Sequence, residues 1–347
     1  MSHEFDVAVL IGRFQPFHNG HAALLATALD KAAEVVVVLG SAHAARNARN
    51  PFTWEERAAM IGASLNEAQR ERVSFLPQRD CYDDRRWAAA VAAAVGQAVA
   101  PGARVALIGH LKDASSDYLK RFPGWSFIPV HQQGEIDATA LRRIFFEGEE
   151  TAAGKAATQA LLGGLVPPAV LHYLLGWAGL APYALLRAEH AAIEESRRIW
   201  GSGPFITVDA VVTAAGHVLL VERGRAPGKG LWALPGGFLD GRERVVQGAI
   251  RELREETGFA LLDAELEGAL KGVAVFDHPD RSARGRTITH AHYFALECSR
   301  LPEVAGADDA ASAFWLPIGE LAANESRLFE DHFNILDHFL GLGGPET

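Results

Sequence analysis

The feature that most constrains the fold is an alternation of short apolar runs and helical stretches over the first 130 residues. The runs that predict strands are residues 5–11, 34–39, 73–76, 104–108 and 126–130. Helical stretches are predicted at 20–33, 53–65 and 85–99, and Thr53 and Glu56 form a capping-box pattern. Strands separated by helices join through right-handed crossovers into a mostly parallel α/β sheet that is covered on both faces. Ligands of such sheets bind at the carboxyl ends of the strands.

The segment after the first apolar run has the properties of a phosphate site. Residues 12–21 read GRFQPFHNGH and lead directly into the first helical stretch. A helix N-terminus offers N–H groups and a partial positive charge, which favours a phosphate. His18 and His21 are three residues apart, so both imidazoles can face the same anion. A histidine pair is more often structural, but its position between a strand and a helix favours an anion site here.

On these residues the chain resembles the HxGH nucleotidyltransferase superfamily. More narrowly, it is similar to the nicotinamide-mononucleotide (NMN) adenylyltransferases of the archaeal and bifunctional bacterial type, over residues 5–177. The resemblance includes residues 50–57 (NPFTWEER), 109–119 (GHLKDASSDYL) and 136–142 (IDATALR). The last segment matches the family's second phosphate motif, ISxTxxR, with Asp137 in place of the usual small residue. The resemblance implies a Rossmann-like N-terminal domain.

The resemblance also implies the chemistry. The 5′-phosphate of NMN attacks the α-phosphorus of ATP and pyrophosphate leaves, with Mg²⁺ on the triphosphate. Because the nucleophile is already an anion, catalysis reduces to positioning and charge stabilisation. The implied catalytic residues are His18, His21 and Arg142, and the implied substrate-binding residues are Arg13, Phe14, Gln15, Arg57 and Thr139. In this scheme Arg13 and Arg142 clamp phosphates, for which the planar guanidinium is suited. Thr139 caps the helix that carries Arg142 and donates to phosphate.

Three further residues have two interpretations each. The family has an acidic, aromatic segment whose tryptophan stacks on the nicotinamide ring, and Trp87 stands at the corresponding place. Trp87 is equally well explained as a core residue at the start of a helix. Lys112 and Asp113 follow a strand end, where a ligand-binding loop is expected, but a charged pair in a loop is usually solvated.

The C-terminal half carries a second motif with fixed spacing. Gly237 is followed after five residues by Glu243, and after seven more by residues 251–259, which read RELREETGF. The pattern predicts a helix over residues 242–257, ended by Gly258. Residues 205–213 and 217–222 precede this motif as two apolar runs joined by a short turn, which predicts a hairpin.

Three glutamates of this helix are candidate metal ligands. Glu252, Glu255 and Glu256 lie at positions i, i+3 and i+4, so their carboxylates share one helix face. Crowded carboxylates repel one another unless cations neutralise them, and hard oxygen ligands suit Mg²⁺ or Mn²⁺. Glu243 and Arg251 are two helical turns apart, and we expect Arg251 to orient a glutamate.

This spacing is the complete Nudix box, GX5EX7REUXEEXGU, by which the C-terminal half is identified as a Nudix hydrolase domain of α/β/α architecture. The resemblance implies metal ions that neutralise a pyrophosphate and activate a water, with Glu255 and Glu256 in catalysis. Residues 277–286 resemble an arginine-rich loop of Nudix enzymes that act on ADP-ribose. Arg281, Arg284 and Arg286 are therefore candidates to bind the substrate's phosphates or terminal ribose, although an exposed basic loop explains them equally well. The general base is not assigned.

The two motifs divide the chain into an adenylyltransferase domain (residues 1–180), a helical linker (181–204) and a Nudix domain (205–347). The net charge is −10, and residues 201–347 carry 13 Lys and Arg against 22 Asp and Glu. Neither half has the basic field of a nucleic-acid binder. Two distant cysteines exclude a disulfide framework, and no apolar run reaches the roughly 18 residues of a membrane span. We expect a cytoplasmic protein without a membrane partner, and a homo-oligomer is compatible with the sequence.

Three functional hypotheses follow. The first is a bifunctional enzyme that makes NAD from NMN and ATP and hydrolyses ADP-ribose to AMP and ribose 5-phosphate. The second keeps the adenylyltransferase but makes the Nudix domain a nucleotide-sensing module, or one that acts on another nucleoside diphosphate derivative. The third changes the first substrate to a phosphopantetheine or a phosphoalcohol. The intact glutamates favour catalysis over sensing, and residues 50–57 and 109–119 favour NMN.

Overall fold

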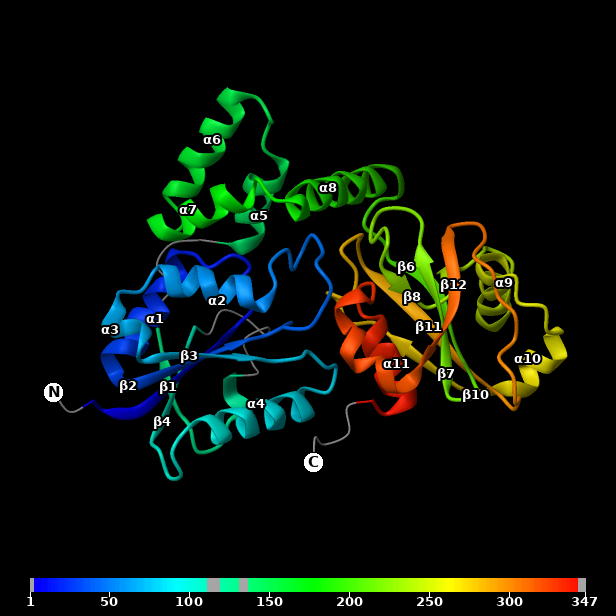
Figure 1. Cartoon of the computed structure of the whole chain (residues 1–347), viewed down its shortest axis with the longest axis horizontal. Coiled ribbons are helices and arrows are strands. Elements are labelled where there is room, and N and C mark those ends of the chain that lie inside the picture. The colour runs from blue at the N-terminus through cyan, green and yellow to red at the C-terminus, as the bar shows by residue number, and fades with distance from the viewer. Residues whose placement is uncertain (1–2, 111–118, 131–136, 343–347) are drawn as a thin grey trace. The chain divides into compact units, whose positions relative to one another are not determined.

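The structure is a computed structural model that describes residues 3–110, 119–130 and 137–342. Its contacts divide the chain into two compact units, residues 1–187 and 188–347 (Figure 1). The division falls inside one helix, α8 (Ala181–Trp200), which occupies most of the segment expected as a linker.

The N-terminal unit is built on a five-stranded parallel sheet of order β3-β2-β1-β4-β5. Its strands are β1 (Phe5–Gly12), β2 (Ala32–Leu39), β3 (Val73–Pro77), β4 (Val105–Gly109) and β5 (Ser126–Pro129). The chain builds outward from β1 on one side and returns to β4 on the other. The switch in strand order therefore lies beside β1, where ligands of doubly wound sheets bind. The predicted Rossmann-like architecture is confirmed.

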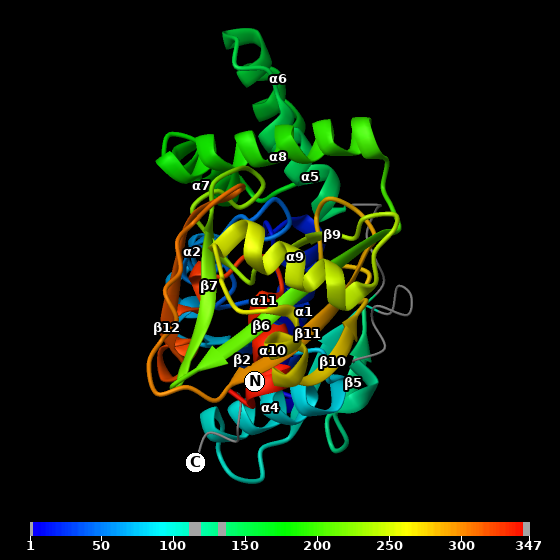
Figure 2. The same ribbon diagram turned by 90° about the vertical axis from the view of Figure 1, so that its right-hand side faces the viewer.

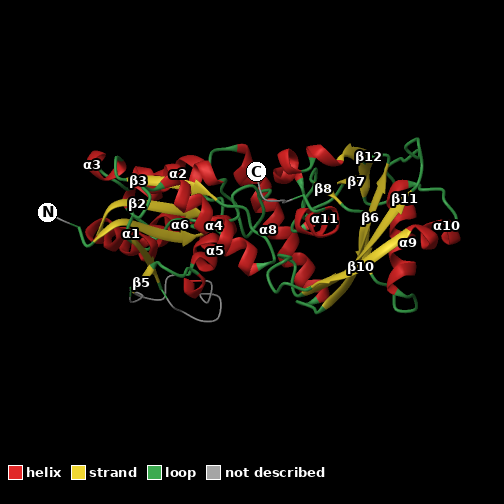
Figure 3. Ribbon diagram, turned by 90° about the horizontal axis from the view of Figure 1, so that it is seen from below, coloured by secondary structure: helices red, strands yellow, loops and turns green. Residues whose placement is uncertain are grey.

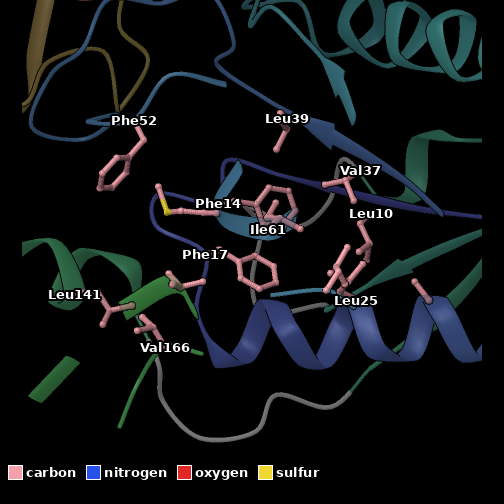
Figure 4. Close-up of a cluster of buried hydrophobic side chains, with 14 of the residues drawn as sticks. Leu10, Phe14, Phe17, Leu25, Val37, Leu39, Phe52, Ile61, Leu141 and Val166 are labelled. Carbon is pink, nitrogen blue, oxygen red and sulfur yellow. The ribbon is translucent and has the colours of Figure 1, made fainter. Parts of the chain in front are cut away.

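Helices cover both faces of this sheet. They are α1 (Asn19–Lys31), α2 (Trp54–Ala63), α3 (Glu67–Arg70), α4 (Asp84–Ala98), α5 (Ala138–Glu147), α6 (Ala152–Gly163) and α7 (Pro168–Trp177). Side chains alternate along β1, so Ala8 and Leu10 join one core cluster while Val7 and Val9 join another. The first cluster, drawn in Figure 4, joins α1, α2 and α5 to the loop after β1. This packing holds the loop after β1 in place.

The C-terminal unit is built on a mixed seven-stranded sheet. The order is β10-β11-β6-β7-β12, with β8 paired to β7 and β9 paired to β6, and only β11 and β6 are parallel. The strands are β6 (Phe205–Ala214), β7 (His217–Arg223), β8 (Trp232–Ala233), β9 (Gly236–Phe238), β10 (Leu270–Phe276), β11 (Thr287–Leu296) and β12 (Ala310–Pro317). The predicted hairpin is present, with Thr213 opposite Val218.

Helices also lie on both faces of this second sheet. α9 (Val245–Thr257) and α10 (Asp263–Ala269) share one core cluster through Leu253 and Leu266, and α11 (His332–Leu340) contributes Phe333 to the cluster on the other face. Two 3₁₀ segments, Ile318–Glu320 and Ala322–Arg327, precede α11. The arrangement is the expected α/β/α sandwich, seen with α9 toward the viewer in Figure 2 and by element type in Figure 3.

Within the described residues, no single helix is long and apolar enough to cross a membrane. Helices α7 and α8 meet the length and composition only when taken together, and the pair is bent by 86° at the break between them.

Candidate active sites

His18 and His21 lie together at the start of α1, directly after the loop that follows β1. His18 is the N-cap residue, and its Nδ1 accepts the backbone N–H of His21 at 3.4 Å. The two rings stack with centroids 3.7 Å apart. Burial lowers the pKa of His18 to about 4, and burial beside His18 holds the pKa of His21 well below its ordinary value. Both rings are therefore neutral near pH 7. Nδ1 of His21 is buried and has no hydrogen-bond partner among the described residues.

Arg142 lies in α5 and reaches the same loop. Its Nη1 donates to the carbonyl of Gln15 at 2.8 Å and its Nη2 to the hydroxyl of Thr139 at 3.1 Å. Burial, together with the positive charges of Arg13 and Arg49, lowers the pKa of Arg142 to about 10. The positive charges of Arg13 and Arg49 thus repel that of Arg142, and a bound anion would relieve this repulsion. Sequence reasoning missed Arg49, whose one signal was its place directly before the motif at residues 50–57.

The cap of α5 is Asp137, so the prediction that Thr139 caps this helix is wrong. The carboxylate of Asp137 accepts the backbone N–H of Thr139 at 3.0 Å. Thr139 is the second residue of the helix, and its hydroxyl accepts from Arg142. The physical reason is that aspartate is among the strongest N-cap residues. The residue that departs from the family motif therefore has a defined role, and its negative charge also raises the pKa of His18 against the effect of burial.

Gln15 and Arg57 hold backbone, where direct substrate binding had been predicted for both. Nε2 of Gln15 donates to the carbonyl of Phe52 at 2.8 Å, and its Oε1 accepts the N–H of Phe52 at 3.0 Å. Arg57 is fully buried and donates to the carbonyls of Arg13 and Gly40 at 2.7 and 2.6 Å. It also donates to those of Ser41 and Thr53. Because these donors are already satisfied, Arg57 positions the loops after β1 and β2.

The remaining predicted residues of this unit have varied surroundings. Phe14 is buried at φ 51°, with its ring edge-on to His21 at 4.8 Å, so it supports the imidazole. Arg13 is exposed in the loop. Trp87 is half-buried in α4 and packs against the second core cluster, which supports the core interpretation. Lys112 and Asp113 lie outside the described residues.

In the C-terminal unit Arg251 joins three of the four glutamates of the motif. Its Nε and Nη2 donate to Glu243 at 3.0 and 2.8 Å, and its Nη1 donates to Glu252 at 2.9 Å and to Glu255 at 2.8 Å. This agrees with the expected role of Arg251 in orienting a glutamate. Glu243 also accepts the N–H of Asp240, so a turn precedes α9 and the helix begins at Val245.

The glycines of the motif let β9 approach the glutamates closely. A Cβ at Gly237 would lie 2.4 Å from Oε1 of Glu252, and one at Gly236 would lie 2.3 Å from the carbonyl of Val208. The N–H of Gly236 donates to the buried Glu256 at 3.0 Å. Burial, with repulsion from Glu252 and from Asp209 of β6, raises the pKa of Glu256 to about 8.

The donor set fits a divalent cation by its chemistry. Glu252 and Glu256 are crowded, mostly buried carboxylates whose pKa values are raised although Arg251 is bound to Glu252. Glu255 adds a half-exposed carboxylate on the same helix face. Hard oxygen ligands of this kind bind Mg²⁺ or Mn²⁺. Within the described ranges, no three His, Cys, Asp or Glu side chains converge on one point, because Arg251 holds Glu252 and Glu255.

A pocket opens beside Glu256. The residues that line it are Thr207, Asp209, Arg223, Leu234, Gly236, Gly237, Phe238, Arg281, Arg284, Phe329, Glu330 and His332. Asp209 is buried and accepts from the hydroxyl of Thr289 at 2.6 Å. Sequence reasoning missed it, although a single aspartate inside the apolar run of β6 was a usable signal.

The three loop arginines have different partners. Arg281 is buried and bound twice to Asp331, at 2.8 and 2.9 Å, so its charge is neutralised within the protein. Arg286 donates to the carbonyl of Asp277 and is not part of the pocket lining. Only Arg284 lines the pocket with a nitrogen, Nε, that is buried and has no hydrogen-bond partner among the described residues. Substrate binding is therefore best supported at Arg284, and it stays a prediction for Arg281, which also lines the pocket, and for Arg286.

Comparison with known proteins supports both halves. A cytidylyltransferase-like family model matches residues 9–141, and the NUDIX domain model matches residues 203–339. A nicotinamide/nicotinic acid mononucleotide adenylyltransferase of Acinetobacter baylyi is 40% identical over 148 residues, which are 42% of this chain and 79% of that protein. An ADP-ribose pyrophosphatase of Methanocaldococcus jannaschii is 32% identical over 137 residues, which are 40% and 73%.

The similarity to one solved structure extends over both units. A bifunctional NMN adenylyltransferase/ADP ribose pyrophosphatase from Francisella tularensis is 35% identical, with a TM-score of 0.87 over 98% of this chain and 100% of that one. The same enzyme has also been solved in complex with AMP and a manganese ion. The chain described here belongs to this family of bifunctional NMN adenylyltransferase and Nudix proteins.

Proposed function

We propose that the N-terminal unit transfers the adenylyl group of ATP to NMN, giving NAD and pyrophosphate. We propose further that the C-terminal unit hydrolyses ADP-ribose to AMP and ribose 5-phosphate with a divalent cation, Mg²⁺ or Mn²⁺. One observation carries the proposal: the chain has both an arginine–histidine anion site and an intact glutamate face. It is also similar over 98% of its length to a bifunctional enzyme.

In the transferase, the chain's own residues position charge. The N-terminus of α1 and the imidazoles of His18 and His21 receive the triphosphate, and Nδ1 of the buried His21 ring meets a phosphate oxygen there. Arg142, held by the carbonyl of Gln15, stabilises the charge that develops on the leaving pyrophosphate. Arg57 keeps the loops after β1 and β2 in place without touching substrate.

In the hydrolase, Glu252, Glu255 and Glu256 would hold the cation. When bound, it neutralises the pyrophosphate and lowers the pKa of a water. Arg251 orients Glu252 and Glu255, and Gly236 and Gly237 let β9 lie close to the glutamates. Arg284 offers its unpartnered nitrogen to an anionic oxygen of the substrate in the adjoining pocket.

Product analysis with two substrate sets tests the proposal. The full-length chain is incubated with NMN plus ATP, and separately with ADP-ribose, each with Mg²⁺ or Mn²⁺ and with chelator. We expect NAD and pyrophosphate in the first set, and AMP and ribose 5-phosphate in the second. Absence of one product pair at saturating substrate and metal would refute that half of the proposal while leaving the other half intact.

Replacing Arg142 with lysine should damage NAD synthesis far more than a conservative change suggests. Lysine offers a point charge where the guanidinium divides its donors between Gln15, Thr139 and a phosphate. We expect a fall in kcat/KM of about 10- to 100-fold, as for the loss of a charge-assisted hydrogen bond worth roughly 1.5–3 kcal/mol. Steady-state kinetics with ATP varied measures it. Near-normal turnover and ATP affinity in Arg142→Lys would rule out a phosphate clamp.

A further inference from the structure

The C-terminal half of α8 contacts two loops beside the hydrolase pocket. This half, residues 188–200, belongs to the C-terminal unit although it lies before the segment matched by the NUDIX model. From the sequence, this half of α8 is expected only to be part of a helical linker. Two of its side chains, Glu189 and Arg197, form hydrogen bonds to the backbone of these loops.

Arg197 holds the arginine loop. Its Nη2 donates to the carbonyl of Ala283 at 2.7 Å and its Nε to the carbonyl of Arg284 at 3.3 Å. Its third nitrogen, Nη1, is bound to Glu194 one turn earlier at 2.6 Å. Because the guanidinium of Arg197 donates to two consecutive carbonyls, it fixes the backbone at Arg284. It thereby also fixes the position of the Arg284 Cβ.

Glu189 holds the opposite loop. It is buried, and its Oε1 accepts the N–H of Gly228 at 2.8 Å. Gly228 has φ 79°, and the neighbouring Pro227 carbonyl accepts from Arg223, which lines the pocket. The ring of Phe329 lies 4.1 Å beneath the Arg223 guanidinium. Two of the three arginines that line the pocket, Arg223 and Arg284, thus contact or belong to a loop that α8 holds.

The geometry assigns α8 to the hydrolase site. We propose that Arg197 is a positioning residue for substrate binding in the C-terminal unit, acting through Arg284. This rests on the proposed ADP-ribose hydrolysis. Arg284 lines the pocket, its Cζ lies 5.6 Å from the half-exposed ring of Phe238, and its buried Nε is without a partner among the described residues. A guanidinium beside an exposed aromatic ring suits a substrate with an anionic group next to a planar base.

For substrate binding, the position of the Arg284 guanidinium matters as much as its charge. Among the described residues, the ion pair of Arg284 is a long one, with its Nη2 3.9 Å from the carboxylate of Glu330. Without Arg197 the loop keeps the bonds of Ser282 and Ala283 to Glu330 but loses the two that fix the carbonyls of Ala283 and Arg284, so the Arg284 side chain is held less firmly at the pocket. The cost should therefore fall on substrate binding, which is seen in KM, and much less on the chemical step at the glutamate face.

The experiment compares three variants of the full-length chain: Arg197→Ala, Arg197→Lys and Arg198→Ala. Arg198 is the matched control, because it is exposed and, within the described part of the chain, its side chain is bound only to Glu195. We expect Arg197→Ala to raise the KM for ADP-ribose about 10-fold, as for lost hydrogen bonds to a charged group, with kcat changed by less than about 3-fold. Arg197→Lys, which keeps one donor and the charge, should recover part of the affinity. Arg198→Ala should match the wild type, and NAD synthesis should be unchanged in all three.

An unchanged KM in Arg197→Ala would overturn the inference. So would equal losses of kcat, of NAD synthesis and of melting temperature, which indicate a general structural role. If the wild-type chain does not hydrolyse ADP-ribose, the proposed function fails separately. The inference is then decided by calorimetric affinity for ADP-ribose in the same variants, where a loss confined to Arg197 supports it and equal affinities reject it.

Discussion

Replacing His21 with alanine should reduce NAD synthesis by about 100-fold or more and leave ADP-ribose hydrolysis near the wild-type rate. Loss of one preorganised group that stabilises transition-state charge typically costs this much in kcat. His21 is the stronger test of the pair, because its buried Nδ1 has no hydrogen-bond partner among the described residues and is therefore available to a phosphate. His18→Ala should also lose activity, but it removes a helix cap as well.

Steady-state rates of both reactions in the same preparation measure the effect. Asparagine at position 18 is the matched comparison, because it restores a cap without an imidazole. We expect His18→Asn to recover the melting temperature of the wild type without recovering NAD synthesis. Similar losses in the two activities after His21→Ala would contradict the assignment of this site to the transferase alone.

The sequence predicts the architecture well because short segments of each unit carry clear strand, helix and motif patterns. The apolar runs at 5–11 and 34–39 became β1 and β2, and the capping box at Thr53 and Glu56 is present at the start of α2. Two fixed-spacing motifs then located both candidate sites. Helix ends differed by a few residues where a side chain, such as Glu243, bonded a turn before the helix.

Roles within the sites were less predictable, because a motif does not say which way a side chain faces. Gln15 and Arg57 belong to segments that match the family, yet both hold backbone across the interior. Arg281 lies in a basic loop but is neutralised by Asp331, fifty residues further along the chain. The contacts of Arg197 were invisible for the same reason, since its partners are carbonyl groups, which any residue type supplies.

Replacing Glu256 with glutamine should reduce ADP-ribose hydrolysis by about 100-fold or more. The change keeps the shape and an acceptor for the N–H of Gly236, but removes a negative charge from the cation site. A bound metal supplies several kcal/mol of transition-state stabilisation, so a weakened site loses orders of magnitude in rate. Glu255→Gln should also reduce hydrolysis, although Glu255 is exposed and already bound to Arg251. NAD synthesis should not change in either variant.

Folding should not suffer in the metal-free protein. Burial and the nearby Glu252 and Asp209 raise the pKa of Glu256 to about 8, so without metal near pH 7 its carboxyl is already mostly neutral. A neutral glutamine of the same shape should therefore replace it without loss of stability. The measurement is a pair: hydrolysis rate against Mg²⁺ concentration, and melting temperature in chelator. Glu267→Gln, an exposed glutamate of α10, is the control and should match the wild type in both. Hydrolysis that stays normal at limiting Mg²⁺ would exclude Glu256 as a metal ligand. A large fall in melting temperature in chelator would instead indicate a structural role for the Glu256 carboxylate.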